Sequence, residues 1–277
     1  MSLSHRALVL LVALLALCAR GGHAVAVRAP QYPALERGDA AFRPFVRMSG
    51  GRRFESREVS RKPRRKDLKV TANYPVLVGD GRPGAREFNR RARAFVLGEV
   101  TPYLYAGRDL EKERSPHWKD VQEYVDVSHK VVYASDEVAS VLFYVQGYNW
   151  GAGHGYHRPV TLNFDLRSGR EIELARLFRP GSNYLRVVAA FCAEDLKRQF
   201  AQKFPGGLGF FPEGFKPRRK NFGSWVFTPD GLVLIFEEYQ VVSYADGEPK
   251  VLIPFERLRE IIDPRGPLAR LAAHEPV

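Results

Sequence analysis

The stretch SVLFYVQGYNWGAGHGYHRPVTLNFDLRSGREIEL, residues 140–174, decides the fold. Its first and third parts are rich in β-branched and aromatic residues, which are typical of strands. A glycine-rich loop separates these two parts, and the residues from Arg167 to Arg170 predict a turn into a further short strand. A similar strand pattern, VQEYVDVSHKVVYAS, occupies residues 121–135. We therefore expect these segments to be neighbouring strands of one sheet.

Two stretches with helical periodicity lie on either side of these strands. The first places apolar residues on one face from Phe88 to Glu99, and Pro102 is expected to end or kink it. The second is expected to begin at an N-cap, Ser182, and to run to about Phe204, with Cys192 on its buried stripe. A short helix is predicted for FERLREII, residues 255–262.

The clearest hairpin connects FGSWVF, residues 222–227, with LVLIFEEY, residues 232–239. Pro229 presets the turn between them, and Gly231 is expected to allow a positive φ. A second turn, Ala245–Glu248, leads into another strand at residues 250–253.

The N-terminus has the pattern of a secretory signal peptide. An apolar run of 13 residues, Ala7–Ala19, is too short to span a bilayer, and small residues follow it. We expect residues 1–24 to be the signal peptide and the chain to be exported, as a periplasmic or secreted protein. A lipid anchor on Cys18 is the weaker alternative, because the residue before a lipoprotein cysteine is normally small and here it is Leu17.

Composition indicates a basic globular protein. The 277 residues include 43 Lys and Arg against 31 Asp and Glu, a formal charge of +12, and 45% are hydrophobic. This composition excludes wholesale disorder, and no later apolar run is long enough to cross a membrane. Cleavage after Ala24 would lower the charge to +10 and leave Cys192 as the single cysteine. No intramolecular disulfide is then possible.

Residues 25–66 are predicted to form a basic extended arm. They show no sustained period and end in RRFESREVSRKPRRK, residues 52–66, where eight basic residues stand against two acids. A short strand around residues 42–48 is the alternative for part of this range. Anionic partners are expected for the arm and for a second basic loop: envelope polymers, lipid head groups or acidic glycans. Nucleic acid is disfavoured because it lies in another compartment. Solvated surface charge is the alternative. The candidate electrostatic residues are Arg61, Lys62, Arg64, Arg65, Lys66, Arg218, Arg219 and Lys220.

Catalytic signatures are absent from the sequence, so no catalytic residue, cofactor or metal site is assigned. The loop after residue 147 instead combines glycines, which allow close backbone approach, with amphipathic aromatic rings and histidines. Together with the turn near residue 245, it is expected to form a recognition surface. A tight structural loop that caps the sheet is the alternative. The candidate binding residues are Tyr148, Asn149, Trp150, His154, Tyr156, His157, Tyr239, Tyr244 and Asp246.

A metal-assisted hydrolase is the rival hypothesis. His154 and His157 could bind a metal, but two ligands are too few and their segment offers no carboxylate. Glu237 and Glu238 do not suit glycan cleavage, since adjacent strand residues point to opposite faces.

Several ordered patches resemble a known family. YPVLVG (residues 74–79), FNRRARAFV (88–96), the stretch 140–178 and the segment 222–262 are similar to the extracytoplasmic domain of the lysozyme-responsive anti-sigma factor RsiV. They are also similar to the N-terminal region of the peptidoglycan deacetylase PdaC, a domain of unknown function. The resemblance covers residues 67–263, with halves at about 67–178 and 179–263, and leaves 264–277 as a tail.

This resemblance implies an α+β domain, in which a curved, mainly antiparallel sheet packs against two long helices and a short C-terminal helix. It also implies cell-wall-related partners. The sequence shows neither a sigma-binding segment nor a deacetylase domain, so those activities are not carried over. Lysozyme is itself basic and would be repelled unless an acidic face near Glu237, Glu238 and Asp246 compensated. We expect an exported, non-catalytic binding module for an envelope component or a secreted protein.

Overall fold

The computed structural model describes residues 44–107, 122–204 and 209–268. All of them belong to one compact unit that begins at Asp39. The predicted signal peptide, Cys18 and most of the C-terminal tail lie outside the described residues, so these predictions stay untested. Within the described ranges, no helix is both long enough and apolar enough to cross a membrane.

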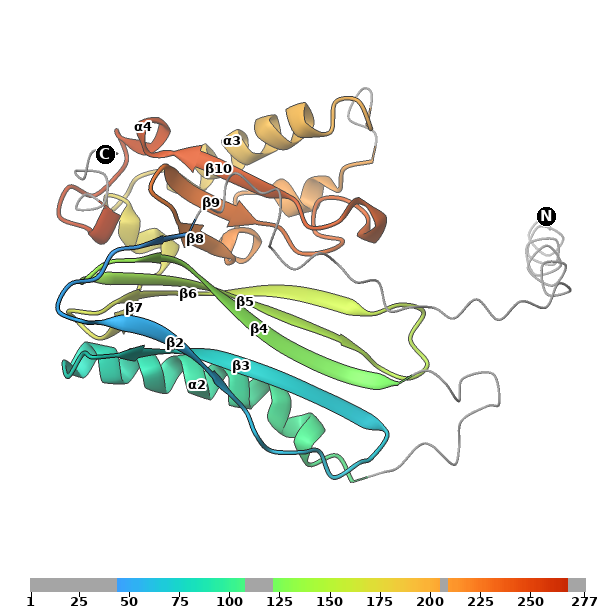
Figure 1. Ribbon diagram of the computed structural model, residues 1–277. Coiled ribbons are helices and arrows are strands. Elements are labelled where there is room, and N and C mark those ends of the chain that lie inside the picture. The colour runs from blue at the N-terminus through green and yellow to red at the C-terminus, as the bar shows by residue number, and fades with distance from the viewer. Residues whose placement is uncertain (1–43, 108–121, 205–208, 269–277) are drawn as a thin grey trace, which may run out of the picture. The chain divides into compact units, whose positions relative to one another are not determined.

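The larger of two sheets confirms the expected run of neighbouring strands (Figure 1). β4, β5 and β6 are antiparallel neighbours, whereas β3 and β1 both pair with β4 in parallel. The sheet order is β2 (Arg53–Glu58), β3 (Leu68–Val78), β4 (Glu123–Ala134), β5 (Val138–Tyr148), β6 (Tyr156–Asp165) and β7 (Arg170–Glu171), with β1 (Phe45–Val46) beside β4.

The smaller sheet is antiparallel, in the order β10 (Lys250–Pro254), β9 (Gly231–Ile235) and β8 (Trp225–Phe227). The helices are α2 (Pro83–Leu104), α3 (Tyr184–Gln199) and α4 (Phe255–Leu258). Short 3₁₀ turns are η4 (Leu174–Leu177), η6 (Pro212–Phe215), η7 (Arg219–Phe222) and η8 (Tyr244–Asp246). Within this unit α2, the large sheet, the small sheet and α3 form successive layers (Figure 1). The predicted α+β class is confirmed, although each long helix covers its own sheet.

α2 buries the face that its sequence period predicts. Phe88, Ala92, Val96 and Val100 recur every fourth residue and are fully buried against the large sheet. The ring of Phe88 meets the edge of Phe164 with ring centroids 5.7 Å apart. The helix continues past Pro102 to Leu104, although Pro102 has no N–H to donate to the carbonyl of Gly98.

α3 covers the small sheet with Val188, Ala189, Cys192 and Leu196. Cys192 is buried, as its place on the helical stripe predicts, and burial raises the pKa of its thiol. The predicted boundaries are wrong. The N-cap is Asn183 rather than Ser182, and the helix ends at Gln199 rather than near Phe204.

Directional hydrogen bonds between buried polar groups join the two sheets. The Oγ of Ser140 on β5 accepts from the Phe227 N–H at 3.0 Å, and the Asn163 side chain on β6 donates to the Trp225 carbonyl at 2.7 Å. Both polar side chains are almost fully buried. Because a buried polar group left unpaired is costly, these bonds fix how β8 lies on the large sheet.

The described part of the predicted arm is not a free arm. Residues 53–58 pair with β3 as an antiparallel edge strand, and Phe45 in β1 stacks on Tyr133 at 5.2 Å. The expected short strand near residues 42–48 corresponds to β1. At the predicted hairpin, Gly231 does not have a positive φ. Glycine is needed at this position for another reason, because a Cβ there would lie 2.1 Å from the Ile253 carbonyl oxygen.

Candidate functional site

Two segments distant in sequence meet beside the β5–β6 loop. The loop supplies His154, and the start of strand β6 supplies His157. The connection after β9 supplies Glu238, Tyr239 and Tyr244. We call these five residues the histidine–tyrosine cluster. The sequence predicted four of them as binding residues, and the structure places them in contact.

The loop has its own internal supports. The Tyr148 hydroxyl donates to the Ala152 carbonyl at 2.9 Å, and the Ala152 N–H donates to the Asn149 carbonyl at 3.0 Å. Gly151 has φ 86, a left-handed conformation that favours glycine. These contacts close a tight turn and direct the chain toward His154.

His154 is exposed and makes two directional contacts through its ring. Its Nδ1 lies 2.6 Å from the Gly155 carbonyl oxygen, which can only accept, so Nδ1 carries the proton. Its Nε2 lies 3.2 Å from the Tyr239 hydroxyl and accepts from it when the ring is neutral. The His154 ring also lies 4.2 Å from the Tyr244 ring. The imidazole is therefore held between two tyrosines.

His157 links the cluster to the large sheet. Its Nδ1 donates to the carboxylate of Glu238, and its backbone N–H lies 3.4 Å from the other Glu238 oxygen. The two side chains are only 13% and 11% exposed. A charge-assisted contact at this burial positions the segment that follows β9.

Tyr239 is the exposed member of the cluster. Its side chain is 53% exposed, and its φ of 59 makes it the one non-glycine residue with positive φ in the described parts of the chain. A left-handed backbone at a residue with a Cβ costs about 1–2 kcal/mol. The fold thus holds an aromatic ring toward solvent in a conformation that glycine would adopt without strain.

Asp246 makes its contacts with residues outside the cluster. Its carboxylate accepts from the Ser243 hydroxyl and backbone N–H, which forms a capping box around η8, and it pairs with Lys203 at 2.5 Å. The Lys203 contact, followed by that of Ser243, lowers the pKa of Asp246. Asp246 therefore fixes the turn that carries Tyr244 and is not itself a free contact residue.

The other predicted binding residues lie around the cluster or apart from it. Asn149 is exposed, and the Trp150 indole N–H is buried with no hydrogen-bond partner among the described residues. Tyr156 faces the α2 side, where its hydroxyl meets that of Tyr103 at 2.9 Å and burial raises its pKa. Sequence reasoning missed the partnership of Glu238 with His157, because 81 positions separate them.

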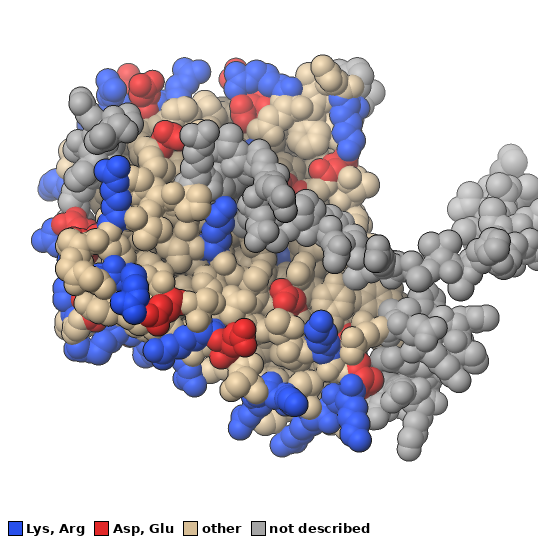
Figure 2. Space-filling model, viewed as in Figure 1, with Lys and Arg blue, Asp and Glu red and all other residues tan. Residues whose placement is uncertain are grey.

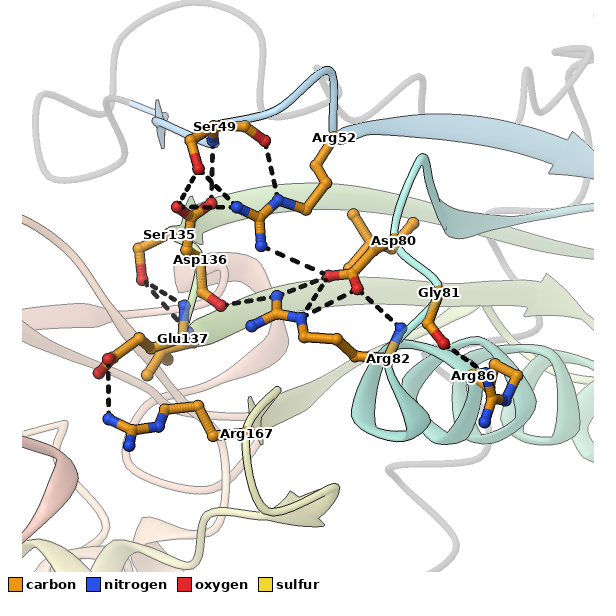
Figure 3. A network of polar contacts seen from close by, with 12 residues as sticks. Ser49, Arg52, Asp80, Gly81, Arg82, Arg86, Ser135, Asp136, Glu137 and Arg167 are labelled. Carbon is orange, nitrogen blue, oxygen red and sulfur yellow. Dashed lines mark hydrogen bonds and ion pairs between the residues drawn. The ribbon is translucent and has the colours of Figure 1, made fainter.

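A different network holds the opposite end of β5 (Figure 3). Asp136, in the turn before β5, accepts from the Ser49 backbone N–H at 2.9 Å and pairs with Arg52 at 3.1 Å. Asp80, just before α2, is 2% exposed and receives the Arg82 Nε at 2.9 Å. The Arg82 guanidinium also donates to the Asp136 carbonyl at 2.8 Å. We call Ser49, Arg52, Asp80, Arg82 and Asp136 the ionic network.

Part of the sequence matches a known protein family. Residues 175–256 match a family described as a protein of unknown function, DUF3298. The match contains α3, all three strands of the small sheet and the segment with Glu238, Tyr239 and Tyr244. His154 and His157 lie before it. The histidine–tyrosine cluster therefore joins the DUF3298 match to the strands that precede it.

The likeness extends beyond the DUF3298 match. The chain is 22% identical over 197 residues to the peptidoglycan-N-acetylmuramic acid deacetylase PdaC of Bacillus subtilis (strain 168), over 71% of this chain and 39% of that protein. It thus spans about two fifths of that relative. The crystal structure of a DUF3298-family member from Bacteroides fragilis superposes with a TM-score of 0.60 at 16% identity, covering 81% of this chain and 98% of that one. One from Pseudomonas aeruginosa gives 0.49 at 16%, covering 77% and 93%. The predicted resemblance is confirmed.

The prediction that Arg65 is an electrostatic contact residue is wrong. Arg65 is 8% exposed and pairs at 2.6 Å with both Asp67 and Glu123, which are also buried, so it is a structural residue. Arg218 lies 3.4 Å from Glu213. The other predicted residues are exposed and form no ion pair in the described ranges. They are Arg61, Lys62, Arg64, Lys66, Arg219 and Lys220.

The acidic face considered for lysozyme does not form at the positions named for it. Glu238 is engaged by His157 and Asp246 by Lys203, which leaves Glu237 as the exposed acid of the three. For the rival metal hypothesis, Glu238 supplies a carboxylate, but it contacts His157 while His154 faces Tyr239. No group of three or more His, Cys, Asp or Glu suited to a metal ion occurs in the described part of the chain.

Proposed function

We propose that this protein is an exported, non-catalytic binding module, which contacts a cell-envelope component or a secreted protein through the histidine–tyrosine cluster. The observation that carries the proposal is Tyr239, a half-exposed aromatic ring on a left-handed backbone. Strained residues persist where the surrounding structure holds them, and they concentrate at functional sites. A residue that only capped the sheet would gain nothing from this conformation.

The chemistry of the surface suits a partner that is partly apolar and partly hydrogen-bonding. The rings of Tyr239 and Tyr244 have centroids 6.0 Å apart and planes inclined by 29°, so they present amphipathic surface beside the His154 imidazole. The relative from Bacillus subtilis is named for its action on peptidoglycan. A peptidoglycan glycan or a protein bound to it is therefore the first ligand to test, and the apolar run near the N-terminus supports an exported location.

Binding to soluble peptidoglycan fragments and capture from envelope extract test the proposal. We expect Tyr239→Gly and His154→Ala to weaken binding at least ten-fold while the melting temperature falls by no more than a few degrees. Val187→Ala is the control, because Val187 is an apolar side chain that is 37% exposed on α3 and does not belong to the cluster. Equal binding by all three variants would contradict a role for the cluster. Stoichiometric zinc in the purified protein would overturn the non-catalytic assignment.

A further inference from the structure

A second surface lies at the C-terminal end of α2 and is independent of the proposed function. The chain from β2 to β3 is fixed there by three contacts. The Val59 N–H donates to Ala72 at 2.9 Å, the Arg64 N–H donates to the Leu104 carbonyl at 3.1 Å, and Arg65 forms its buried ion pairs. The backbone between these anchors is therefore held in one place.

Four basic side chains of this segment are exposed: Arg61, Lys62, Arg64 and Lys66. None of them forms an ion pair within the described ranges. On the outer face of α2, in contrast, Glu87 neutralises Arg90 and Arg91. Figure 2 shows Lys and Arg side chains gathered at the lower margin of this face, where Figure 1 places the end of α2, with few acidic side chains among them. Within the described ranges, no carboxylate thus neutralises the charge of this segment through an ion pair.

Tyr105 organises the two arginines. Its ring is 41% exposed, and the guanidinium carbons of Arg61 and Arg64 lie 5.2 and 5.1 Å from its centroid. Cation–π attraction holds both guanidinium groups near one ring despite their mutual repulsion. Such pre-organisation favours an anionic ligand, because less side-chain freedom is lost when the ligand binds.

The dipole of α2 does not account for four cations. No basic residue lies in the last turn of α2, so a cation beside the Leu104 carbonyl is favourable there. This effect decays within the last turn, and one guanidinium satisfies it.

We propose that Arg61, Lys62, Arg64, Lys66 and Tyr105 form a surface that binds the phosphate groups of an anionic lipid bilayer. Guanidinium groups match phosphate oxygens in a bidentate manner, and lysines add point charges. A half-exposed tyrosine suits the headgroup region, where its ring meets apolar surface and its hydroxyl stays hydrated. A soluble polyphosphate would use the charges but has no apolar part to meet the ring.

The test is binding to vesicles by the chain that starts at residue 25, without the apolar run of residues 7–19. The described core lies wholly after residue 25. We expect binding to phosphatidylcholine vesicles that contain 30% phosphatidylglycerol, and none to pure phosphatidylcholine. Because each surface cation near an anionic bilayer contributes about five-fold, Arg61→Ala with Arg64→Ala should weaken binding roughly 30-fold. Lys62→Gln with Lys66→Gln removes two exposed side chains that form no ion pair within the described ranges. This double variant should give a similar loss and guards against misfolding.

The control removes two exposed cations elsewhere. Arg219→Ala with Lys220→Ala should weaken vesicle binding less than about three-fold, and Tyr239→Gly should leave it unchanged. Equal losses for all the charge pairs would show that only net charge matters and would overturn the proposed surface. Tyr105→Ala should weaken binding several-fold with no change in charge. Complete displacement from vesicles by inorganic polyphosphate at equal phosphate concentration, with no effect of Tyr105→Ala, would identify a soluble polymer as the partner instead.

Discussion

The turn before β5 and the loop after it lie at the two ends of one strand, about 35 Å apart at 3.3 Å per residue. Different contacts hold these two ends. Charged groups from three connections meet at the turn, where Asp80 is almost fully buried (Figure 3). At the loop, rings and one histidine–carboxylate pair meet, and Tyr239 stays half exposed on a strained backbone. The turn before β5 thus provides several contacts for every charged group, whereas the loop after β5 leaves an aromatic surface exposed.

Removing Asp80 should produce the largest effect. Asp80→Ala leaves Arg82 and Arg52 without their shared carboxylate. We expect the free energy of unfolding to fall by about 2–3 kcal/mol. This loss is at the lower end for a buried ion pair because Arg82 is partly exposed. Urea denaturation measures it. Asp195→Ala is the control, since its pair with Arg198 is on the helix surface, and it should lose less than about 0.5 kcal/mol. Equal losses would mean that the ionic network contributes no more than a surface pair.

Acid should weaken the same end of the strand. The contacts of Arg82 lower the pKa of Asp80, and those of Ser49 lower the pKa of Asp136. A carboxyl whose pKa is lower in the folded state stabilises the fold above its unfolded pKa, about 3.9, and loses that contribution as pH falls through the folded pKa. Between about pH 4 and pH 2, the unfolding free energy of the wild-type protein should therefore fall more steeply than that of Asp80→Ala. Parallel curves would contradict this assignment.

At the loop, the expected effects are smaller and come from the backbone. Gly151→Ala should lower the free energy of unfolding by about 1 kcal/mol, because φ 86 disfavours a Cβ although no atom lies within 4 Å of one. Thermal unfolding measures this loss. Gly81→Ala, where φ is ordinary and the space is also open, is the matched control and should not destabilise the protein. A neutral Gly151→Ala would show that the loop adapts.

Tyr239→Gly should produce the smallest change in stability and so sharpens the comparison most. The strain that is relieved, about 1–2 kcal/mol, offsets the ring contacts with Tyr244 and His154 that are lost. We expect the free energy of unfolding, measured by urea denaturation, to change by less than about 1 kcal/mol in either direction. A loss of 3 kcal/mol or more would show that the ring holds the fold together and that its exposure is incidental.

The sequence predicted elements whose contacts are local. The spacing of Phe88, Ala92 and Val96 identified the buried face of α2, and the residues between Phe227 and Gly231 identified the hairpin. The loop around His154 was recognised by composition, and its predicted neighbours Tyr239 and Tyr244 do contact it. Whether these residues bind a partner stays a prediction.

Long-range pairing could not be read from one sequence. RFESRE resembles a charged arm because an edge strand with one solvent-facing side tolerates charge, and its partner begins ten residues later, after a basic run. Within that run nothing distinguishes Arg65 from its neighbours, although Asp67 and Glu123 bury it. Glu238 likewise shows no local sign of His157. In each case the deciding partner is a residue on another element.

The edge position of β2 has a consequence for where the chain can be shortened. On one side of β3, β2 pairs with residues 73–78, and on the other the Asn89 side chain bonds both the N–H and the carbonyl of Leu77. A chain that began at residue 67 would keep the second contact and lose the first. The backbone groups beside the apolar Val76 and Leu77 would then form an open edge, which invites pairing with another copy. Such a fragment is expected to self-associate, so the charged strand acts as the cover that keeps the protein from aggregating.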